Sequence, residues 1–323
     1  NIFGQDYEIT LSMGVAFYPD HGRQLDYLNN CAEQALSEAK NLGGNTIHFY
    51  SSENTALLEQ GIFIERDLRK AIQNGELIVY YQPKINLNDQ KIYGFEALIR
   101  WNHPEKGIIP PGMFIPLAEQ TSMISEIGQL VIQQTAKQIR KWNDQGFHNI
   151  CISVNIVAQQ LRRGQLLDDL DEAIKLNCIS GSNLELEITE SSLVENSETV
   201  MNVLNQIKER DINISLDDFG TGYSSLSYLA EFPIDILKID RSFVSKIGES
   251  KQDAIVSAMV AMGKAMGMKV VAEGIETEQQ LDFLRQLGCD IAQGYLFSKP
   301  LPEQQATEFL EQNMTPETYT YQV

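Results

Sequence analysis

From residue 76 onward, the hydrophobic residues of this chain alternate between two patterns. Short apolar runs predict strands, and longer stretches in which apolar residues recur every three or four positions predict amphipathic helices. The expected strands are Leu77–Leu87, Lys91–Trp101, Ile150–Asn155, Leu184–Thr189, Ile212–Asp217, Asp235–Ile239, Met268–Glu273 and Cys289–Gln293. The expected helices are Pro111–Glu119, Ile124–Gln145, Gly164–Leu176, Ser197–Arg210, Asp253–Met266, Glu276–Leu287 and Pro302–Gln312.

Repeated strand and helix units predict an α/β fold with a largely parallel sheet. Eight strands in about 240 residues match the size of a TIM-type (β/α)8 barrel. Only Asn88-Asp89-Gln90 separates the first two strands, which is too short for a helical crossover, so these strands should pair antiparallel. We therefore expect a modified barrel with one antiparallel strand.

The residues before the barrel predict a small α/β fragment, with a strand at Tyr7–Phe17, a helix at Leu25–Asn41 and a strand at Thr46–Tyr50. This fragment is too small to stand alone, and the chain looks cut from a longer protein. We divide the chain into this fragment (1–54), a connecting helix (55–75), the barrel (76–313) and a C-terminal tail (314–323).

The composition is that of a globular protein, with 323 residues, 43% hydrophobic and 21% charged. No apolar run reaches membrane-spanning length and no secretory signal opens the chain, so we expect a cytoplasmic protein, with a membrane-anchored parent left open. The four cysteines lie far apart and indicate neither a zinc site nor a disulfide framework. A formal charge of −19 argues against binding to duplex nucleic acid.

In barrels of this type the reacting groups lie at the C-terminal ends of the strands. Polar residues mark these ends here, namely Glu96, Asn155, Glu187, Asp217, Asp218, Lys238, Glu273 and Gln293. Each one alone has a structural explanation, as a helix cap, a solvent-facing side chain or half of an ion pair. Because strand after strand contributes one, we expect them to form a single cluster.

Glu96 and Arg100 lie on the same face of the second strand. This pair suits a structural ion pair, and it also suits a metal site beside a bound phosphate or guanine. Oxygen donors without Cys or His favour Mg²⁺ or Mn²⁺. Two such ions balance the four charges of the carboxylates in this set, which are Glu96, Glu187, Asp217 and Asp218, with Asn155 as a neutral donor.

Seven motifs in this order resemble the EAL family of cyclic di-GMP (c-di-GMP) phosphodiesterases, over about Thr55 to Gln312. They are Tyr80-Tyr-Gln-Pro, Glu96-Ala-Leu-Ile-Arg, Ser153-Val-Asn, Glu187-Ile-Thr-Glu, Asp217-Asp-Phe-Gly-Thr-Gly-Tyr-Ser-Ser-Leu, Leu237-Lys-Ile-Asp, and Ala272-Glu-Gly-Ile-Glu followed by Gln293-Gly-Tyr. The resemblance implies hydrolysis of c-di-GMP to linear 5′-pGpG with two Mg²⁺ or Mn²⁺ ions.

The resemblance also implies roles for single residues. The metal ligands would be Glu96, Asn155, Glu187, Asp217 and Asp218. Lys238 would hold the nucleophilic water, and Glu273 would be the general base. The substrate would be contacted by Gln82, Arg100 and Gln293. Glu190 and Glu276 would support the loop that starts at Asp218, which in the family connects the metal site to dimer contacts, so a homodimer is expected.

The first 50 residues resemble the tail of a GGDEF diguanylate cyclase domain, through Ser12-Met-Gly-Val-Ala, Ala35-Leu-Ser-Glu-Ala-Lys and Gly43-Gly-Asn. The signature Gly-Gly-Asp/Glu-Glu-Phe is absent from the chain, so this piece cannot make c-di-GMP alone.

Two alternatives remain. A catalytically weak EAL domain could act as a c-di-GMP receptor, although every metal-site position that we match carries the expected side chain. An aldolase-type barrel could form a Schiff base on Lys238, which the four convergent carboxylates argue against.

Overall fold

The computed structural model describes residues 10–19, 21, 24–41, 44–50, 67–194, 197–220 and 231–314. The chain divides into two compact units, Asn1–Lys70 and Ala71–Val323. This division lies inside the expected connecting helix, of which residues 67–74 are helical and residues 55–66 lie outside the described residues.

The first unit contains strand β1 (Met13–Val15), helix α1 (Leu25–Asn41) and strand β2 (Ile47–Phe49). The two strands pair parallel, as expected of a strand–helix–strand unit. Cys31 and Ala35 of the helix pack with Tyr50 and Ala16 in a small core. The helix has the bounds predicted from the sequence, whereas the first strand is shorter than predicted, and residues 7–9 lie outside the described residues.

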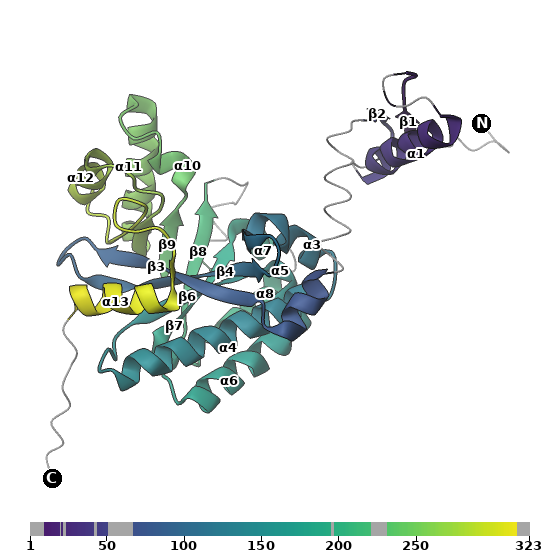
Figure 1. Ribbon diagram of the computed structural model, residues 1–323. Coiled ribbons are helices and arrows are strands. Elements are labelled where there is room, and N and C mark those ends of the chain that lie inside the picture. The colour runs from purple at the N-terminus through teal and green to yellow at the C-terminus, as the bar shows by residue number, and fades with distance from the viewer. Residues whose placement is uncertain are drawn as a thin grey trace, which may run out of the picture. The chain divides into compact units, whose positions relative to one another are not determined.

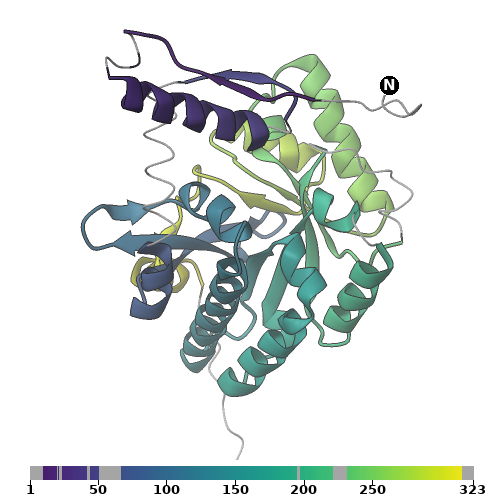
Figure 2. The same ribbon diagram turned by 90° about the vertical axis from the view of Figure 1, so that its right-hand side faces the viewer.

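The second unit is a closed barrel of eight strands with helices around it (Figures 1 and 2). Its strands are β3 (Leu77–Asn86), β4 (Ile92–His103), β6 (Cys151–Ile156), β7 (Leu184–Thr189), β8 (Asn213–Phe219), β9 (Ile236–Ile239), β10 (Lys269–Ala272) and β11 (Ile291–Gln293). Around the barrel their order is β3-β11-β10-β9-β8-β7-β6-β4, and the pairing of β3 with β4 closes it. The predicted fold class and all eight strands are confirmed.

Strand β3 is the antiparallel member of the barrel. It runs antiparallel to both neighbours, β4 and β11, while the other neighbouring strands of the barrel pair parallel. In the turn to β4, the side chains of Asn86 and Asp89 accept backbone hydrogen bonds two residues on, and Gln90 has a positive φ of 60°. Such local bonds stabilise tight turns, so the short connection predicted here forms a hairpin.

Two short strands extend the sheet beyond the barrel. β5 (Gly107–Ile109) pairs with the end of β4, and β12 (Leu301–Pro302) pairs with β3. Sequence periodicity did not predict them, because two or three residues are too few for an alternating pattern to be recognised.

The helices follow the prediction with local differences. They are α3 (Ile115–Glu119), α4 (Met123–Asp144), α5 (Ala158–Arg163), α6 (Gln165–Asn177), α7 (Glu190–Val194), α8 (Ser197–Lys208), α10 (Arg241–Val244), α11 (Ser250–Ala265), α12 (Glu278–Gln286) and α13 (Glu303–Asn313), with 3-10 turns at Pro111–Met113 and Gly181–Asn183. The predicted helix 111–119 is broken at Phe114, whose φ of −125° is not helical. Gly164, at a φ of 74°, separates α5 from α6, and the short helices α5, α7 and α10 were not predicted.

Helix α4 covers the hairpin that carries the antiparallel strand. The Trp142 ring lies 5.6 Å from that of Tyr81 and 4.8 Å from that of Phe95, between ring centroids. Its indole N–H donates to Thr307 of α13 at 3.0 Å, so one buried side chain joins β3, β4 and two helices.

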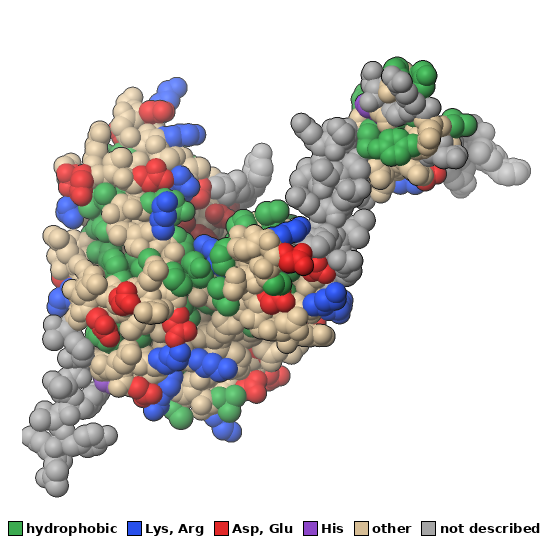
Figure 3. Space-filling view, in the orientation of Figure 1, with side chains coloured by type: hydrophobic (Ala, Val, Ile, Leu, Met, Phe, Trp, Pro, Cys, Tyr) green, Lys and Arg blue, Asp and Glu red, His purple; other side chains and the backbone are tan. Residues whose placement is uncertain are grey.

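Among the described helices, none is long and apolar enough to cross a membrane. On the face of the second unit drawn in Figure 3, Lys and Arg side chains are interspersed with Asp and Glu and form no large basic patch.

Candidate active site

The polar residues predicted from the strand ends meet inside the barrel. Lys238, in the middle of β9, is the centre of one group: its ammonium forms ion pairs with Glu187 of β7, Asp217 of β8 at 3.2 Å and Glu273 at 2.6 Å. Glu273 directly follows β10. Four successive strands therefore contribute to one cluster, as the spacing predicted.

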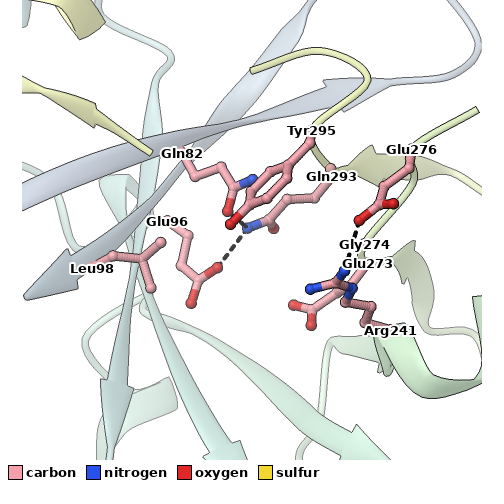
Figure 4. A pocket seen from close by; sticks show the side chains of 10 residues that line it. Gln82, Glu96, Leu98, Arg241, Glu273, Gly274, Glu276, Gln293 and Tyr295 are labelled. Carbon is pink, nitrogen blue, oxygen red and sulfur yellow. Dashed lines mark hydrogen bonds and ion pairs between the residues drawn. The ribbon is translucent and has the colours of Figure 1, made fainter. Parts of the chain in front are cut away.

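Glu96 of β4 is the centre of a second group. Its carboxylate accepts hydrogen bonds from the amide of Asn155 at 2.8 Å and from the amide of Gln293 at 2.5 Å. Figure 4 shows the bond to Gln293. Gln293 also donates to Gln82 at 3.2 Å, and Gln82 donates to the backbone of Ser298 at 3.1 Å. Glu96 is thus tied to Gln293 of β11, which in turn bonds to Gln82, the residue opposite Glu96 on the neighbouring strand β3.

The two groups are close enough to share a cation. Glu96, Glu187 and Glu273 each offer a carboxylate oxygen, and these atoms lie within 4.8 Å of one another. The buried Oε1 atom of Gln293 has no hydrogen-bond partner among the described residues. A buried oxygen of this kind is costly unless an ion or water satisfies it. The donor set is all oxygen, so the residues fit a hard divalent cation.

Burial and mutual repulsion spread the pKa values of these carboxyl groups. Burial, and then the charge of Glu187, raise the pKa of Glu96. Burial likewise raises the pKa of Glu273 to about 8, although Lys238 opposes this shift. Glu187 differs: burial alone would raise its pKa, but Lys238 and Lys84 hold it well below its usual range. Glu187 is therefore the carboxylate of this set that stays charged most readily.

Lys238 keeps its charge. Burial alone would lower its pKa, but Glu187, Glu273 and Glu96 raise it well above the usual value. A lysine that forms a Schiff base must lose its proton, which requires a depressed pKa. The surroundings of Lys238 therefore argue against the aldolase-type alternative.

Asp217 and Asp218 form a bulge in β8. Leu216 pairs with Leu237 and Phe219 with Ile239, so both aspartates lie opposite the single residue Lys238. Asp218 has a φ of 55°, in the left-handed region, and its N–H donates to the side chain of Asp217 at 2.9 Å. In a regular strand consecutive side chains point to opposite faces, whereas a bulge re-aims one of them. Burial and the Asp217 charge raise the pKa of Asp218.

A cavity of about 180 Å³ opens beside these carboxylates (Figure 4). Its lining consists of Gln82, Glu96, Leu98, Arg241, Glu273, Gly274, Glu276, Gln293, Gly294 and Tyr295. A larger and mainly apolar cavity, of about 410 Å³, shares Leu98 with it and is also lined by Asn155. Polar groups beside an apolar cavity suit a ligand that has both polar and apolar parts.

Arg100 lies outside the lining of the smaller cavity. Its guanidinium donates to the backbone of Ile99 at 2.8 Å and lies 5.6 Å from the ring centroid of Tyr80. No ion pair joins it to Glu96 in the described part of the chain, so the structural ion pair considered for these two residues does not form. Burial lowers the pKa of Arg100, against the opposing effects of Tyr295 and Glu96.

Glu190 and Glu276 were predicted to support the loop after β8. Glu190 is buried and accepts a hydrogen bond from the N–H of Gly220 at 3.1 Å, at the start of that loop. Residues 221–230, which include most of the predicted loop motif, lie outside the described residues. Glu276 pairs with Arg241 at 2.7 Å (Figure 4), and its predicted role toward the loop stays a prediction.

Three residues near this site were missed at the sequence level. Lys84 and Glu185 are buried in the barrel, and Arg241 lines the cavity. Strand alternation could have found the first two, because Lys84 shares a face with Gln82, and Glu185 shares one with Glu187. Arg241 lies in a short helix that carried no pattern.

Comparison with known proteins adds an independent result. A protein-family model described as "EAL domain" matches residues 65–300. The bifunctional diguanylate cyclase/cyclic di-GMP phosphodiesterase MucR of Pseudomonas aeruginosa is 40% identical over 301 residues, which is 93% of this chain and 44% of MucR. The cyclic di-GMP phosphodiesterase NbdA of the same species is 39% identical over 308 residues, 95% of this chain and 39% of NbdA.

A solved structure described as the PaMucR phosphodiesterase in complex with c-di-GMP superimposes with a TM-score of 0.73 and 42% identity. The match covers 75% of this chain and 99% of that one. The chain thus spans less than half the length of the two curated relatives, but almost all of this solved chain.

Proposed function

Because this chain belongs to the EAL domain family, we propose that it hydrolyses c-di-GMP to linear 5′-pGpG at a site for two divalent cations, Mg²⁺ or Mn²⁺. The observation that carries the proposal is the group of three carboxylates, Glu96, Glu187 and Glu273, gathered within 4.8 Å inside the barrel. The solved c-di-GMP complex of a relative supports the choice of substrate.

The cations would be held by Glu96, Asn155, Glu187, Asp217 and Asp218. When bound, divalent cations stabilise charge on phosphoryl oxygens and lower the pKa of nearby water. The bulge in β8 supports this assignment, since it brings both aspartates opposite Lys238. In the ligand set, Glu96 and Asn155 are already joined by a hydrogen bond, so their side chains are oriented before any ligand arrives.

Lys238 would position the attacking water. It is fully buried, its charge is fixed, and three carboxylates orient its ammonium. Glu273 would accept the proton of that water, because its carboxylate lines the cavity and lies 2.6 Å from the Lys238 ammonium.

In the proposed reaction the oxygen of water attacks phosphorus and the bond from phosphorus to the 3′ oxygen breaks. The 3′ oxygen takes up a proton, and the product keeps its 5′ phosphate. Gln82, Arg100 and Gln293 would contact the substrate. Gln82 and Gln293 line the cavity, and Arg100 supplies a cation for phosphate or guanine close to Tyr80.

The test is incubation of the purified chain with c-di-GMP and Mn²⁺, Mg²⁺ or Ca²⁺, followed by chromatography of the nucleotides. We expect 5′-pGpG with Mn²⁺ and Mg²⁺, little with Ca²⁺, and none after chelation with EDTA. Binding of c-di-GMP without any product in Mn²⁺ would instead support a receptor. Turnover that is unaffected by EDTA would contradict the two-metal mechanism.

A further inference from the structure

Inside the barrel, a chain of ion pairs with alternating Glu and Lys side chains extends from the carboxylate cluster. Lys84 of β3 lies 2.9 Å from Oε1 of Glu185 and 2.8 Å from Oε1 of Glu187. The other oxygen of Glu187, Oε2, pairs with Lys238. These four residues, Glu185, Lys84, Glu187 and Lys238, are called the charge row. All four are at most 1% exposed.

The charge row is expensive to bury. Charged groups lose their hydration inside a protein, and apolar side chains of similar volume are often at least as stable in their place. The charge row therefore calls for a role other than stability. Its two lysines and two glutamates compensate each other, so no member is left with an unpaired charge.

Lys84 and Glu187 come from distant parts of the barrel wall. In the order around the barrel, β4 and β6 lie between β3 and β7, so Lys84 reaches through the interior to Glu187. Its two carboxylate partners sit two residues apart on β7 and point to the same side. Lys84 thus holds two carboxylates of β7 at once, and one of them, Glu187, also pairs with Lys238.

We propose that Lys84 is a positioning residue for this site, which clamps Oε1 of Glu187 so that Oε2 stays turned toward Lys238 and the cation position. Because Glu185 also pairs with Lys84, its negative charge offsets part of the attraction between Lys84 and Glu187. Glu187 can then still attract a cation through Oε2. This inference rests on the proposed function, in which Glu187 is a cation ligand. Partners that orient a metal ligand commonly change metal affinity by about 10- to 100-fold when they are removed.

The test is a comparison of Mn²⁺ binding, by isothermal titration calorimetry without substrate, between the unmodified chain and the double variant Lys84→Met/Glu185→Gln. The double change removes one positive and one negative charge together, so neither partner is left buried and alone. We expect the dissociation constant for Mn²⁺ to rise about 10-fold or more. With c-di-GMP and saturating Mn²⁺, kcat should fall while KM changes little.

The matched control is Lys208→Met, which breaks the half-buried pair of Lys208 with Asp235 at 2.6 Å, away from the cluster. It should leave Mn²⁺ binding unchanged. A double variant that melts at a lower temperature but binds Mn²⁺ as tightly as the unmodified chain would show a purely structural role and overturn the proposal.

A second measurement does not depend on the folding of any variant. In a crystal structure of the unmodified chain with Mn²⁺, Lys84 should remain within hydrogen-bond distance of Oε1 of Glu187 while Oε2 faces the metal. Lys84 turned away from Glu187 in that structure would overturn the proposal. If the unmodified chain binds Mn²⁺ but does not hydrolyse c-di-GMP, the proposed function fails, and the Mn²⁺ comparison still decides the role of Lys84.

Discussion

Two side chains organise the polar interior of the barrel, and they do so with different chemistry. Lys238 holds Glu187, Asp217 and Glu273 by charge, whereas Glu96 is held by the amides of Asn155 and Gln293. Glu96 consequently has no cation of its own in direct contact among the described residues, and its pKa is raised by burial and by Glu187. A bound divalent cation would relieve both effects.

The change Glu96→Gln tests this at the scale of one residue. The amide keeps the size of the side chain but removes the negative charge, so a cation loses a ligand and Gln293 faces an amide instead of a carboxylate. We expect kcat with Mn²⁺ to fall by about 100-fold or more, in the range seen when one group that stabilises transition-state charge is lost. Initial rates of 5′-pGpG formation measure it.

The same chemical change at an exposed position provides the control. Glu105, in the turn between β4 and β5, is exposed, and Glu105→Gln should retain the full rate. A Glu96→Gln variant as active as Glu105→Gln would remove Glu96 from the proposed ligand set.

At the scale of elements, the helices do more than cover the barrel. Trp142 fixes α4 against the β3–β4 hairpin and α13, which keeps the antiparallel strand with Gln82 and Lys84 in register with β4.

Helix α6, which packs beside α4, carries a buried acidic residue on its inner face. This residue, Asp169, is 7% exposed.

Asp169→Asn should make the protein more stable at neutral pH. Burial, and then the charges of Glu172 and Asp168, raise the pKa of Asp169 above its usual value of 3.8, while Gln129 opposes the shift. The folded state thus binds more protons than the unfolded state above pH 3.8, so this carboxyl costs stability as the pH rises through its folded pKa. Asparagine removes that cost.

Melting temperatures measured from pH 4 to pH 8 check this expectation. The variant should melt higher than the unmodified chain near pH 7, and the difference should shrink toward pH 4. The neighbouring Asp168 is exposed, so Asp168→Asn should have a smaller effect. A difference for Asp169→Asn that is constant across this pH range would show that the carboxyl titrates alike in the folded and unfolded states.

At the scale of the whole molecule, the barrel is complete within the second unit. Its strands close on one another through the β3–β4 pair, and the cluster of Glu96, Lys238 and Glu273 comes entirely from that unit. The solved PaMucR relative matches 75% of this chain and is itself covered almost completely. All residues of the proposed active site therefore belong to the second unit, Ala71–Val323.

A shortened chain of residues 65–314 should therefore fold cooperatively, bind Mn²⁺ and form 5′-pGpG at the rate of the full chain. Urea unfolding, calorimetric titration with Mn²⁺ and initial rates measure these three properties. A shortened chain that folds but turns over more slowly would show that the first unit contributes to activity.

Light scattering measures the molar mass of both chains in solution and so tests the predicted homodimer.

Much of the barrel and its site was predictable because the signals are local. Alternation along a strand separates Ser215 and Asp217 from Ile214 and Leu216, and this period is a property of the backbone itself. Strands that run parallel end at the same edge, so their last polar residues must meet, and Lys238, Glu187 and Glu273 do. The roles of the site residues came from resemblance and remain predictions.

The tertiary structure alone decided which of these side chains touch. Gln293 lies 197 residues from Glu96 along the chain and donates a hydrogen bond to it. Lys84 likewise lies 103 residues from Glu187 and donates to it. These contacts form because closure of the barrel directs side chains of β3, β4, β7 and β11 into one interior. The bulge at Asp217–Asp218 likewise depends on pairing with β9. The sequence by itself determined the order of strands and helices and the polar ends of the strands, since periodicity and turn residues are local. Pairing partners, protonation and the charge row were left to the folded barrel, since each depends on distances between groups far apart in the chain.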